Sequence, residues 1–401
     1  MTLPDKSHSH PGDCISDEKQ LRILMVDSHA AVERGGAVQC ASLALALARR
    51  GHRVTCIFDG RPNQPLQGFW FQSLQRAGVR ILRLGLQSPA AMLRLRRILT
   101  EERPDIIHTH KNRALIFVYF ATMGMRRPVW VANRGTVYPL SLSRLAYFIH
   151  RRHVARIFAV AHAVRDVLVT DGVAGEKVEV VYGSFDPGRF DPELSGDALR
   201  HAWHVPAGSP LVGLIGSLNT PKKGHPVLLE AATLLKEKQP DLRFVLVGEG
   251  DPGDLQSQAA SLGVSDRVIF AGFTEDVPAA LAAMDIVVCP SLRGEGLTGA
   301  LREALAMARP VISSDVAGNR ELVSHNHTGL LVPPGDPLAL ADAIDRLLSD
   351  GKLARDCAAR GRELVLELCT EENRAARVEK IYRELLSDQA GQQFRSVDKV
   401  N

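Results

Sequence analysis

Residues 291–312 read SLRGEGLTGALREALAMARPVI, and this stretch follows the apolar run IVVC at 286–289. An apolar run that ends in a glycine turn is typical of a strand end, and the Ala and Leu residues from position 300 onward recur at helical spacing. A second apolar run begins at 311. A strand, a crossover helix and a second strand form a βαβ unit, so the stretch predicts an α/β domain with a parallel sheet.

The alternation of strand and helix continues on both sides of this unit, in two separate runs. The first run opens with LRILMV at 21–26, and the second opens with LVGLI at 211–215. Further strands are predicted at 54–58, 80–84, 106–108, 129–132, 157–160 and 178–182, and then at 244–247, 268–270, 286–289, 311–313 and 330–332. Between the runs, FDPGRFDPELSGD at 185–197 is rich in residues that favour turns.

Two doubly wound, Rossmann-like domains are therefore expected, at 21–185 and 208–370, on either side of a linker at 186–207. A helix is expected at 371–390, and it could return to the first domain. Ligands of open α/β sheets bind outside the carboxyl ends of the strands. Two such domains facing each other would form an interdomain cleft, and the function is expected there.

The composition excludes several classes of protein. At 401 residues with 45% hydrophobic and 23% charged residues, the chain is globular and long enough for two domains. The polar residues 1–20 lack an apolar core, so we expect a disordered tail, not a signal peptide, and a cytoplasmic protein. The longest apolar stretches, near 37–48 and 114–125, are shorter than the roughly 18 to 20 residues that span a bilayer.

Charge and cysteine content point away from two further classes. A net charge of +4 is too small to indicate a nucleic-acid partner. The six cysteines show no paired short spacing, so buried thiols are expected in place of a disulfide framework or a zinc site.

Two glutamates, Glu295 and Glu303, lie eight positions apart around the start of the predicted helix at 298–308. The unpaired N–H groups and the positive dipole end of such a helix bind anions such as a diphosphate. With a rise of about 1.5 Å per residue, the two acids stand on the order of 8 to 10 Å apart along the axis. This separation suits a nucleotide-sugar, with its hexose near Glu295 and its ribose near Glu303. The alternative is that both acids only stabilise the helix dipole.

Two lysines in the second domain are expected to bring positive charge to the same part of the cleft. Lys222 and Lys223 follow its first strand, in the loop SLNTPKKG, and a cation there can reach the cleft and offset the charge of a diphosphate. A lysine pair before a glycine is otherwise a solvated turn.

These motifs occur together with RFVLVGEGD, VIFAGFTEDV and ARPVISSDVAGNRELVSHNHTGLLVPPGDP, in this order. The region from about 211 to 348 resembles the nucleotide-sugar-binding domain of retaining glycosyltransferases with the GT-B fold, specifically glycosyltransferase family 4. In the first half, ERGGA at 33–37 is similar to the family's glycine-rich loop, and PDIIHTHKNR at 104–113 is similar to its strand-end histidine motif.

The resemblance implies a role for each matching residue. Glu303 would hold the ribose, Glu295 the transferred sugar, and Lys223 would neutralise the leaving diphosphate. The remaining donor-binding positions would be Gly35, Gly36, Lys222, Phe273, Thr274, Gly296, Leu297 and Thr298, with Phe273 and Thr274 at the base and His110 facing the donor sugar. The chain departs from the family where a diphosphate-binding arginine is usual, because Ser217 stands there. Arg293 or Arg320 could substitute for it.

The family resemblance also implies sugar transfer with retention of anomeric configuration and without a cofactor. An oxocarbenium-like transition state with a departing nucleoside diphosphate needs positive charge at the phosphate, which Lys223 and the helix start can supply. The chain contains no D-x-D sequence, so no motif for a metal-bound diphosphate is present and metal-independent transfer is expected.

The acceptor-side half contains a basic amphipathic segment, PLSLSRLAYFIHRRHVARIF at 139–158. One predicted helical face contains Leu142, Leu145, Phe148 and Ile149, and the basic residues beside or after it are Arg144, Arg151, Arg152, His153 and Arg156. Such a face either lies on an anionic membrane or packs into its domain. Envelope glycolipids or polysaccharides are the expected acceptors, with peripheral contact at the inner face of the membrane.

Three other functions fit parts of the pattern. A nucleotide-sugar epimerase can have the same fold, and a non-catalytic nucleotide-sugar-binding protein could keep the donor domain. A nicotinamide-dependent dehydrogenase is less well supported, because the first turn lacks the full G-x-G-x-x-G pattern and the second strand offers only Asp59.

Overall fold

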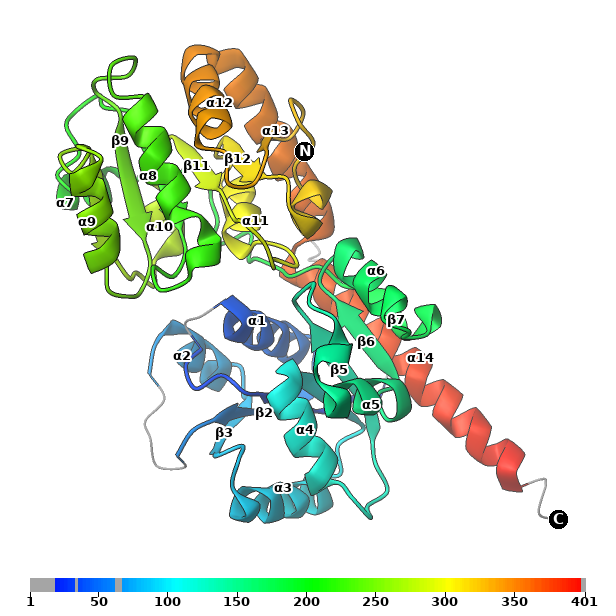
Figure 1. The fold of residues 1–401 in the computed structure, drawn as a ribbon. Coiled ribbons are helices and arrows are strands. Elements are labelled where there is room, and N and C mark those ends of the chain that lie inside the picture. The colour runs from blue at the N-terminus through cyan, green and yellow to red at the C-terminus, as the bar shows by residue number, and fades with distance from the viewer. Residues whose placement is uncertain (1–18, 33–34, 62–66, 398–401) are drawn as a thin grey trace, which may run out of the picture.

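The computed structural model describes residues 19–32, 35–61 and 67–397, with side chains to residue 391. Most of the tail expected at 1–20 lies outside the described residues, as do Cys14 and the first two residues of ERGGA, Glu33 and Arg34. Two parallel sheets, each covered by helices, form two α/β domains (Figure 1). The expected fold class is confirmed.

The first sheet has seven strands, which are all parallel to their neighbours. In spatial order they are β3 (Arg80–Leu84), β2 (Arg53–Asp59), β1 (Arg22–Asp27), β4 (Ile106–His110), β5 (Val129–Arg134), β6 (Arg156–Ala159) and β7 (Val178–Val180). The strand order reverses direction between β1 and β4, and the carboxyl ends of these strands are where a doubly wound sheet binds ligands.

Helices and 3-10 turns connect the strands of the first domain. They are α1 (Gly35–Arg49), α2 (Phe69–Arg76), α3 (Pro89–Glu102), α4 (Lys111–Ala121), η1 (Leu140–Leu142), α5 (Arg144–Arg152), α6 (His162–Thr170) and η2 (Gly175–Lys177). Helix α1 lies on the side of the first domain that faces the second domain (Figure 1).

The second sheet has six parallel strands. In spatial order they are β10 (Val268–Gly272), β9 (Arg243–Val247), β8 (Leu211–Ile215), β11 (Ile286–Cys289), β12 (Val311–Ser314) and β13 (Leu330–Val332). Its helices and 3-10 turns are η3 (Pro221–Lys223), α8 (His225–Leu234), α9 (Gly253–Ser261), α10 (Val277–Ala282), α11 (Gly299–Ala306), η4 (Ala317–Glu321), α12 (Pro337–Ser349) and α13 (Gly351–Leu368).

The segment between the two sheets packs on the second domain. It contains the helix α7 (Asp197–Ala202), and Phe185 and Phe190 lie in the same apolar core as β8, β11 and α11. A Cβ on Gly196 would lie 2.2 Å from the backbone nitrogen of Ala283, so only glycine permits this close approach.

The last helix, α14 (Glu371–Val397), runs back along the first domain (Figure 1). Its side chains Val378, Ile381 and Tyr382 are buried in the core formed by β1, β2 and α1. The Tyr382 hydroxyl lies 2.7 Å from Nδ1 of His108 on β4. The chain therefore passes between the domains twice, and the two passages pair at Phe185 and Thr370.

Glycine and carboxylate contacts join the domains above the cleft. The backbone of Gly296 in the second domain approaches Gly135 in the first so closely that a Cβ would lie 2.6 Å from the Gly135 carbonyl oxygen. Nearby, the Glu321 carboxylate accepts hydrogen bonds from the N–H groups of His162 and Ala163 and from the Tyr182 hydroxyl, at 2.8 to 3.0 Å. These contacts hold the β11–α11 loop and η4 against the first domain.

Among the described residues, no helix combines the length and the apolar character that a membrane crossing requires. The five described cysteines are all buried and free.

Candidate functional site

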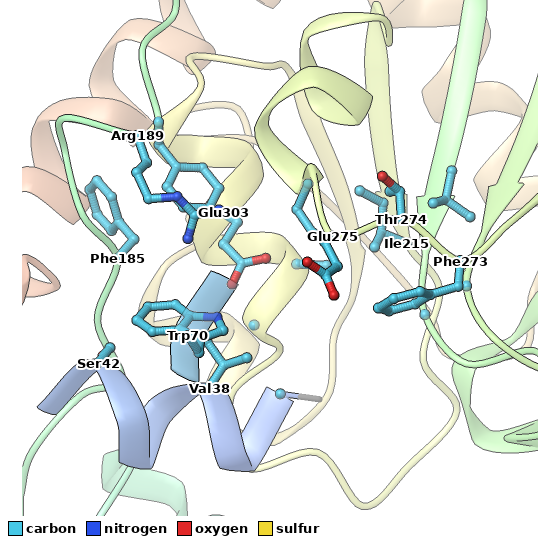
Figure 2. Close-up of a pocket in the computed structure, with 18 of the residues that line it drawn as sticks. Val38, Ser42, Trp70, Phe185, Arg189, Ile215, Phe273, Thr274, Glu275 and Glu303 are labelled. Atoms are coloured by element: carbon cyan, nitrogen blue, oxygen red, sulfur yellow. The ribbon is translucent and has the colours of Figure 1, made fainter. Parts of the chain in front are cut away.

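A cavity of about 340 Å³ lies between the two domains, at the carboxyl ends of both sheets. Helices α1 and α2 form its wall on the first domain, and α11 with the loops after β8, β9 and β10 form its wall on the second (Figure 2). The cavity brings together six of the predicted site residues: Gly35, Ser217, Lys223, Phe273, Thr274 and Glu303. The position of the cleft was expected from the fold.

Both predicted lysines converge on the first predicted glutamate. The Lys223 Nζ lies 3.1 Å from Oε1 of Glu295, and the Lys222 Nζ lies 3.7 Å from the same oxygen. Gly224 explains the local geometry, because its φ is +78° and a Cβ there would lie 1.9 Å from the Pro290 carbonyl oxygen. The glycine lets the lysine loop pack onto the end of β11, beside Glu295.

The second predicted glutamate, Glu303, lines the cavity from α11. Burial raises its pKa, and the guanidinium groups of Arg302 and Arg189 oppose part of that rise. The nearer of these, Arg302, places Nη2 3.4 Å from the Glu303 carboxylate. A carboxylate in this position can accept two hydroxyl hydrogen bonds, as a ribose would offer.

The start of α11 has one of its N–H groups already satisfied. The N–H of Thr298 donates to the Asn319 side chain at 3.2 Å, and Asn319 is braced in turn by Ser313. The lining residues at this helix start are Gly299 and Ala300. The resemblance implies that Gly296, Leu297 and Thr298 present backbone to the diphosphate. Of these, the N–H of Thr298 is engaged within the protein, and the cavity instead reaches Gly299 and Ala300.

His110 lies at the end of β4, buried beneath α1, and does not line the cavity. Burial holds its pKa well below the usual value for histidine, so the ring is neutral at pH 7. Its Nε2 has no hydrogen-bond partner among the described residues. Atoms of Asp27, Cys40 and His110 that could bind a metal lie within 4.8 Å of one another, and burial keeps the Cys40 thiol protonated by raising its pKa.

The arginine that lines the cavity is not one of the two suggested by the sequence. Arg293 and Arg320 do not line it, and Arg320 forms an ion pair with Asp315. Arg189, from the segment between the domains, does line it. Ser217 donates to the Glu249 carbonyl at 3.5 Å and adds no charge.

The sequence analysis also missed two aromatic side chains on α2, Phe69 and Trp70, which line the cavity. The Arg189 guanidinium lies 4.1 Å from the ring centre of Phe69 and 5.6 Å from that of Trp70. Trp70, Arg189 and Glu303 all line the cavity, and the Arg189 charge acts on the Glu303 carboxylate (Figure 2). The stacking fixes Arg189 between the two domains, and the only sequence signal was an aromatic pair at the start of a short helix.

Two protein families and several individual proteins are similar to this chain. The family described as Glycosyltransferase Family 4 matches residues 34–189, and the family described as Glycosyl transferases group 1 matches residues 209–350. A phosphatidyl-myo-inositol mannosyltransferase from Mycobacterium leprae is 31% identical over 69% of this chain and 73% of its own. An N-acetyl-alpha-D-glucosaminyl L-malate synthase from Bacillus anthracis is 25% identical over 88% of this chain and 95% of its own.

Two solved structures show the same fold. A glycosyltransferase from Rickettsia africae covers 92% of this chain and 99% of its own, with a TM-score of 0.79 and 21% identity. The Anabaena protein HepE, solved with UDP and glucose, covers 90% of this chain and 99% of its own, with a TM-score of 0.79 and 22% identity.

Proposed function

Because the chain belongs to the group 1 glycosyltransferases of family 4, which have the GT-B fold, we propose that it moves a sugar from a nucleoside-diphosphate sugar to an envelope acceptor with retention. The observation that carries this proposal is the convergence of Lys222, Lys223 and Glu295 beside the cavity that Glu303 lines. In these positions, cations and carboxylates alternate along one edge of the cleft.

The alternation matches the chemistry of a nucleotide-sugar. Its ribose hydroxyls would pair with Glu303, its diphosphate with Lys223 and Lys222, and its sugar hydroxyls with Glu295. The diphosphate would replace part of the ion pairing that the lysines now make with Glu295, and this pairing holds both ammonium groups in place beforehand. Preorganised charge of this kind is the largest single contribution to many enzymatic rates.

In the proposed reaction, the bond between the anomeric carbon and the diphosphate oxygen breaks, the acceptor hydroxyl oxygen bonds to the same face of the sugar, and the hydroxyl proton passes to the departing diphosphate. Negative charge grows on the leaving diphosphate, where Lys223 would stabilise it. The start of α11 adds its dipole. These groups can supply the positive charge that the step needs, so we propose transfer that is independent of a metal or other cofactor.

The acceptor is proposed to be a glycolipid or polysaccharide intermediate of the cell envelope. The name of one relative supports a lipid acceptor, since it is a phosphatidyl-myo-inositol mannosyltransferase. We propose that the protein works in the cytoplasm and makes peripheral contact with the inner face of the membrane.

The test is a panel of UDP-, GDP- and dTDP-hexoses, measured by thermal stabilisation and by slow donor hydrolysis, each with and without EDTA. We expect one nucleotide class to raise the melting temperature and to be hydrolysed, with EDTA making no difference. Failure of every donor to bind would refute the proposed function. Binding that EDTA abolishes would refute metal independence alone. Proton NMR of the product anomer then tests retention.

A further inference from the structure

The basic amphipathic segment begins with η1, which contains Leu142, and continues through the extended Ser143 into α5, so the predicted single helical face is interrupted. The structure divides the apolar residues of the segment into two groups. Ala146 and Ile149 are fully buried in the core of the first domain. Leu142, Leu145 and Phe148 are exposed by 77%, 36% and 45%. The sequence pattern alone could not separate these groups, because all five fall within one broad helical stripe. We call the exposed stripe, formed by Leu142, Leu145 and Phe148, the α5 face.

The exposed apolar surface extends beyond α5. Phe120 and Met123, at and after the end of α4, are exposed by 42% and 50%, and α4 packs against α5. The Tyr119 ring joins the two helices, because its centre lies 6.2 Å from that of Phe148 and 5.4 Å from that of Phe120. Large apolar patches on a protein surface mark contacts with a membrane or another protein.

A second cavity, of about 640 Å³, opens beside the α5 face. Its lining includes the rings of Tyr147 and Phe148 and three cationic side chains, Arg151, Arg152 and Lys177. The lining contains no acidic residue; its remaining members are Gly172, Val173 and Ala174. We call this space the α5 pocket.

Two of the three cations are held in place by the protein. The Lys177 Nζ donates to the carbonyl oxygens of Arg151 and Val154, at 2.9 and 3.2 Å. The Arg151 guanidinium lies 5.1 Å from the ring centre of Tyr147 and donates to its hydroxyl at 2.9 Å. These contacts position the charges without neutralising them.

The cations around the α5 face have no carboxylate partner within ion-pairing distance in the described part of the chain. This holds for Arg144, Arg151, Arg152 and Lys177. The acid Asp171 accepts from the N–H of Ser141, and Glu179 pairs with Arg156 and Arg377. Glu176, next to Lys177, attracts that lysine electrostatically without forming an ion pair, so the pocket keeps a net positive charge. A cationic pocket beside an exposed apolar stripe is complementary to a surface that offers anionic phosphates and acyl chains together.

We propose that the α5 face docks on an anionic membrane, with a lipid phosphate in the α5 pocket. Leu142, Leu145 and Phe148 enter the boundary between headgroups and acyl chains, and Arg151, Arg152 and Lys177 surround the phosphate. A soluble protein partner would need matching acids, and a free phosphate would leave the apolar stripe exposed. An anionic membrane supplies phosphates for the cationic pocket and acyl chains for the apolar stripe.

The docking surface lies next to the cleft along the chain. The loop between β5 and α5 contains Gly135, whose carbonyl touches Gly296, and Tyr138, whose hydroxyl packs against Gly294. Leu142 follows four residues after Tyr138. This step rests on the proposed function. A lipid-linked acceptor in the docked membrane would have to cross only this loop to meet the donor sugar.

The experiment is sedimentation of the full chain with vesicles of phosphatidylcholine alone or with about one third phosphatidylglycerol. We expect at least tenfold stronger partition to the anionic vesicles, and at least fivefold loss in either Arg151→Ala/Arg152→Ala or Leu142→Ser/Phe148→Ser. The double variant Lys352→Ala/Arg355→Ala, on the exposed surface of α13, removes the same charge elsewhere and should bind like the wild type.

Three results would overturn the proposal. They are equal binding to neutral and anionic vesicles, binding that both α5 variants leave intact, and calorimetric binding of inorganic phosphate with no vesicle binding. Thermal stabilisation by the donor is measured in the same variants, and it should equal that of the wild type. Loss of vesicle binding with donor binding intact separates this proposal from the proposed function, because the α5 residues do not line the cleft cavity.

Discussion

Replacing Lys223 by Met removes the ammonium group closest to Glu295 and keeps most of the side-chain volume. We expect the turnover number to fall on the order of 100-fold. The structure sets this magnitude through a distance, because Nζ lies 3.1 Å from a Glu295 carboxylate oxygen, and we expect a similar separation between Nζ and an oxygen of the bound diphosphate. At such a distance and an effective dielectric constant near 20, two unit charges interact by about 5 kcal/mol.

A leaving diphosphate gains roughly half a charge on the way to the transition state, so the differential stabilisation is about 2 to 3 kcal/mol. Lys222 stands farther from Glu295, at 3.7 Å, and its side chain is more exposed, so its loss should cost less than tenfold. Lys223→Arg keeps the charge and should retain more activity than Lys223→Met.

The assay measures initial rates of sugar transfer at saturating donor, with calorimetry of the free nucleoside diphosphate in parallel. Folding of each variant is controlled by its melting temperature. Two results would refute the reasoning: a turnover number for Lys223→Met within threefold of the wild type, or a larger loss in Lys222→Met than in Lys223→Met. The second result would show that Lys222, and not Lys223, stabilises the leaving diphosphate.

Three further predictions follow from other parts of the site and fold. Glu303→Ala should raise the donor KM at least about tenfold with kcat within a few-fold, because a ribose contact is alike in ground and transition states; an unchanged KM would contradict it. His110→Ala should leave nucleotide binding nearly intact by calorimetry, because His110 does not line the cavity; it should cut radiolabelled sugar transfer at least about tenfold, because the family resemblance places this side chain at the donor sugar, where it would position the reacting groups. Normal transfer would make His110 a structural residue. Glu379 has a pKa lowered to about 2, despite its burial, by hydrogen bonds from Arg50 and Arg383, so it stabilises the fold above its unfolded pKa of about 4.3 and that contribution disappears as the pH falls toward 2. Glu379→Gln should therefore lose on the order of 2 kcal/mol of unfolding free energy at pH 7 and approach the wild type below about pH 3, measured by urea denaturation; an equal loss at both pH values would exclude the ionic origin.

The strands were predictable because they are buried on both faces and consist of nearly continuous Val, Ile and Leu. The predicted strands at 80–84, 211–215, 286–289 and 330–332 agree with β3, β8, β11 and β13 at both ends. β10 extends two residues beyond the predicted 268–270, across an irregular register between Phe270 and Gly272. The helix α7 was not predicted, because it forms in a Pro- and Gly-rich segment whose order comes from packing against α10.

The charged part of the site was predictable because its residues lie in short, ordered motifs. Lys223, Glu295 and Glu303 each follow a strand or begin a helix, and the topology brings such positions to one edge of the sheet. Arg189 and Trp70 could not be found in this way, since they are far apart in the chain and meet only through the packing of the segment at 185–190 on α2. The glycosyltransferase prediction is confirmed, and the family matches and the mannosyltransferase relative give no support to the dehydrogenase or epimerase alternatives.

The return of α14 has a consequence for engineering. The first domain is not a contiguous piece of chain, because Tyr382 and its neighbours on α14 complete the core around β1 and α1, and the Tyr382 hydroxyl bonds to His108. A hybrid enzyme that exchanges only residues 19–184 with a homologue would pair a foreign sheet with the native closing helix. Exchanging the first domain therefore requires two transplanted segments, the amino-terminal one and the helix beginning at Glu371, spliced at the paired crossings near Phe185 and Thr370.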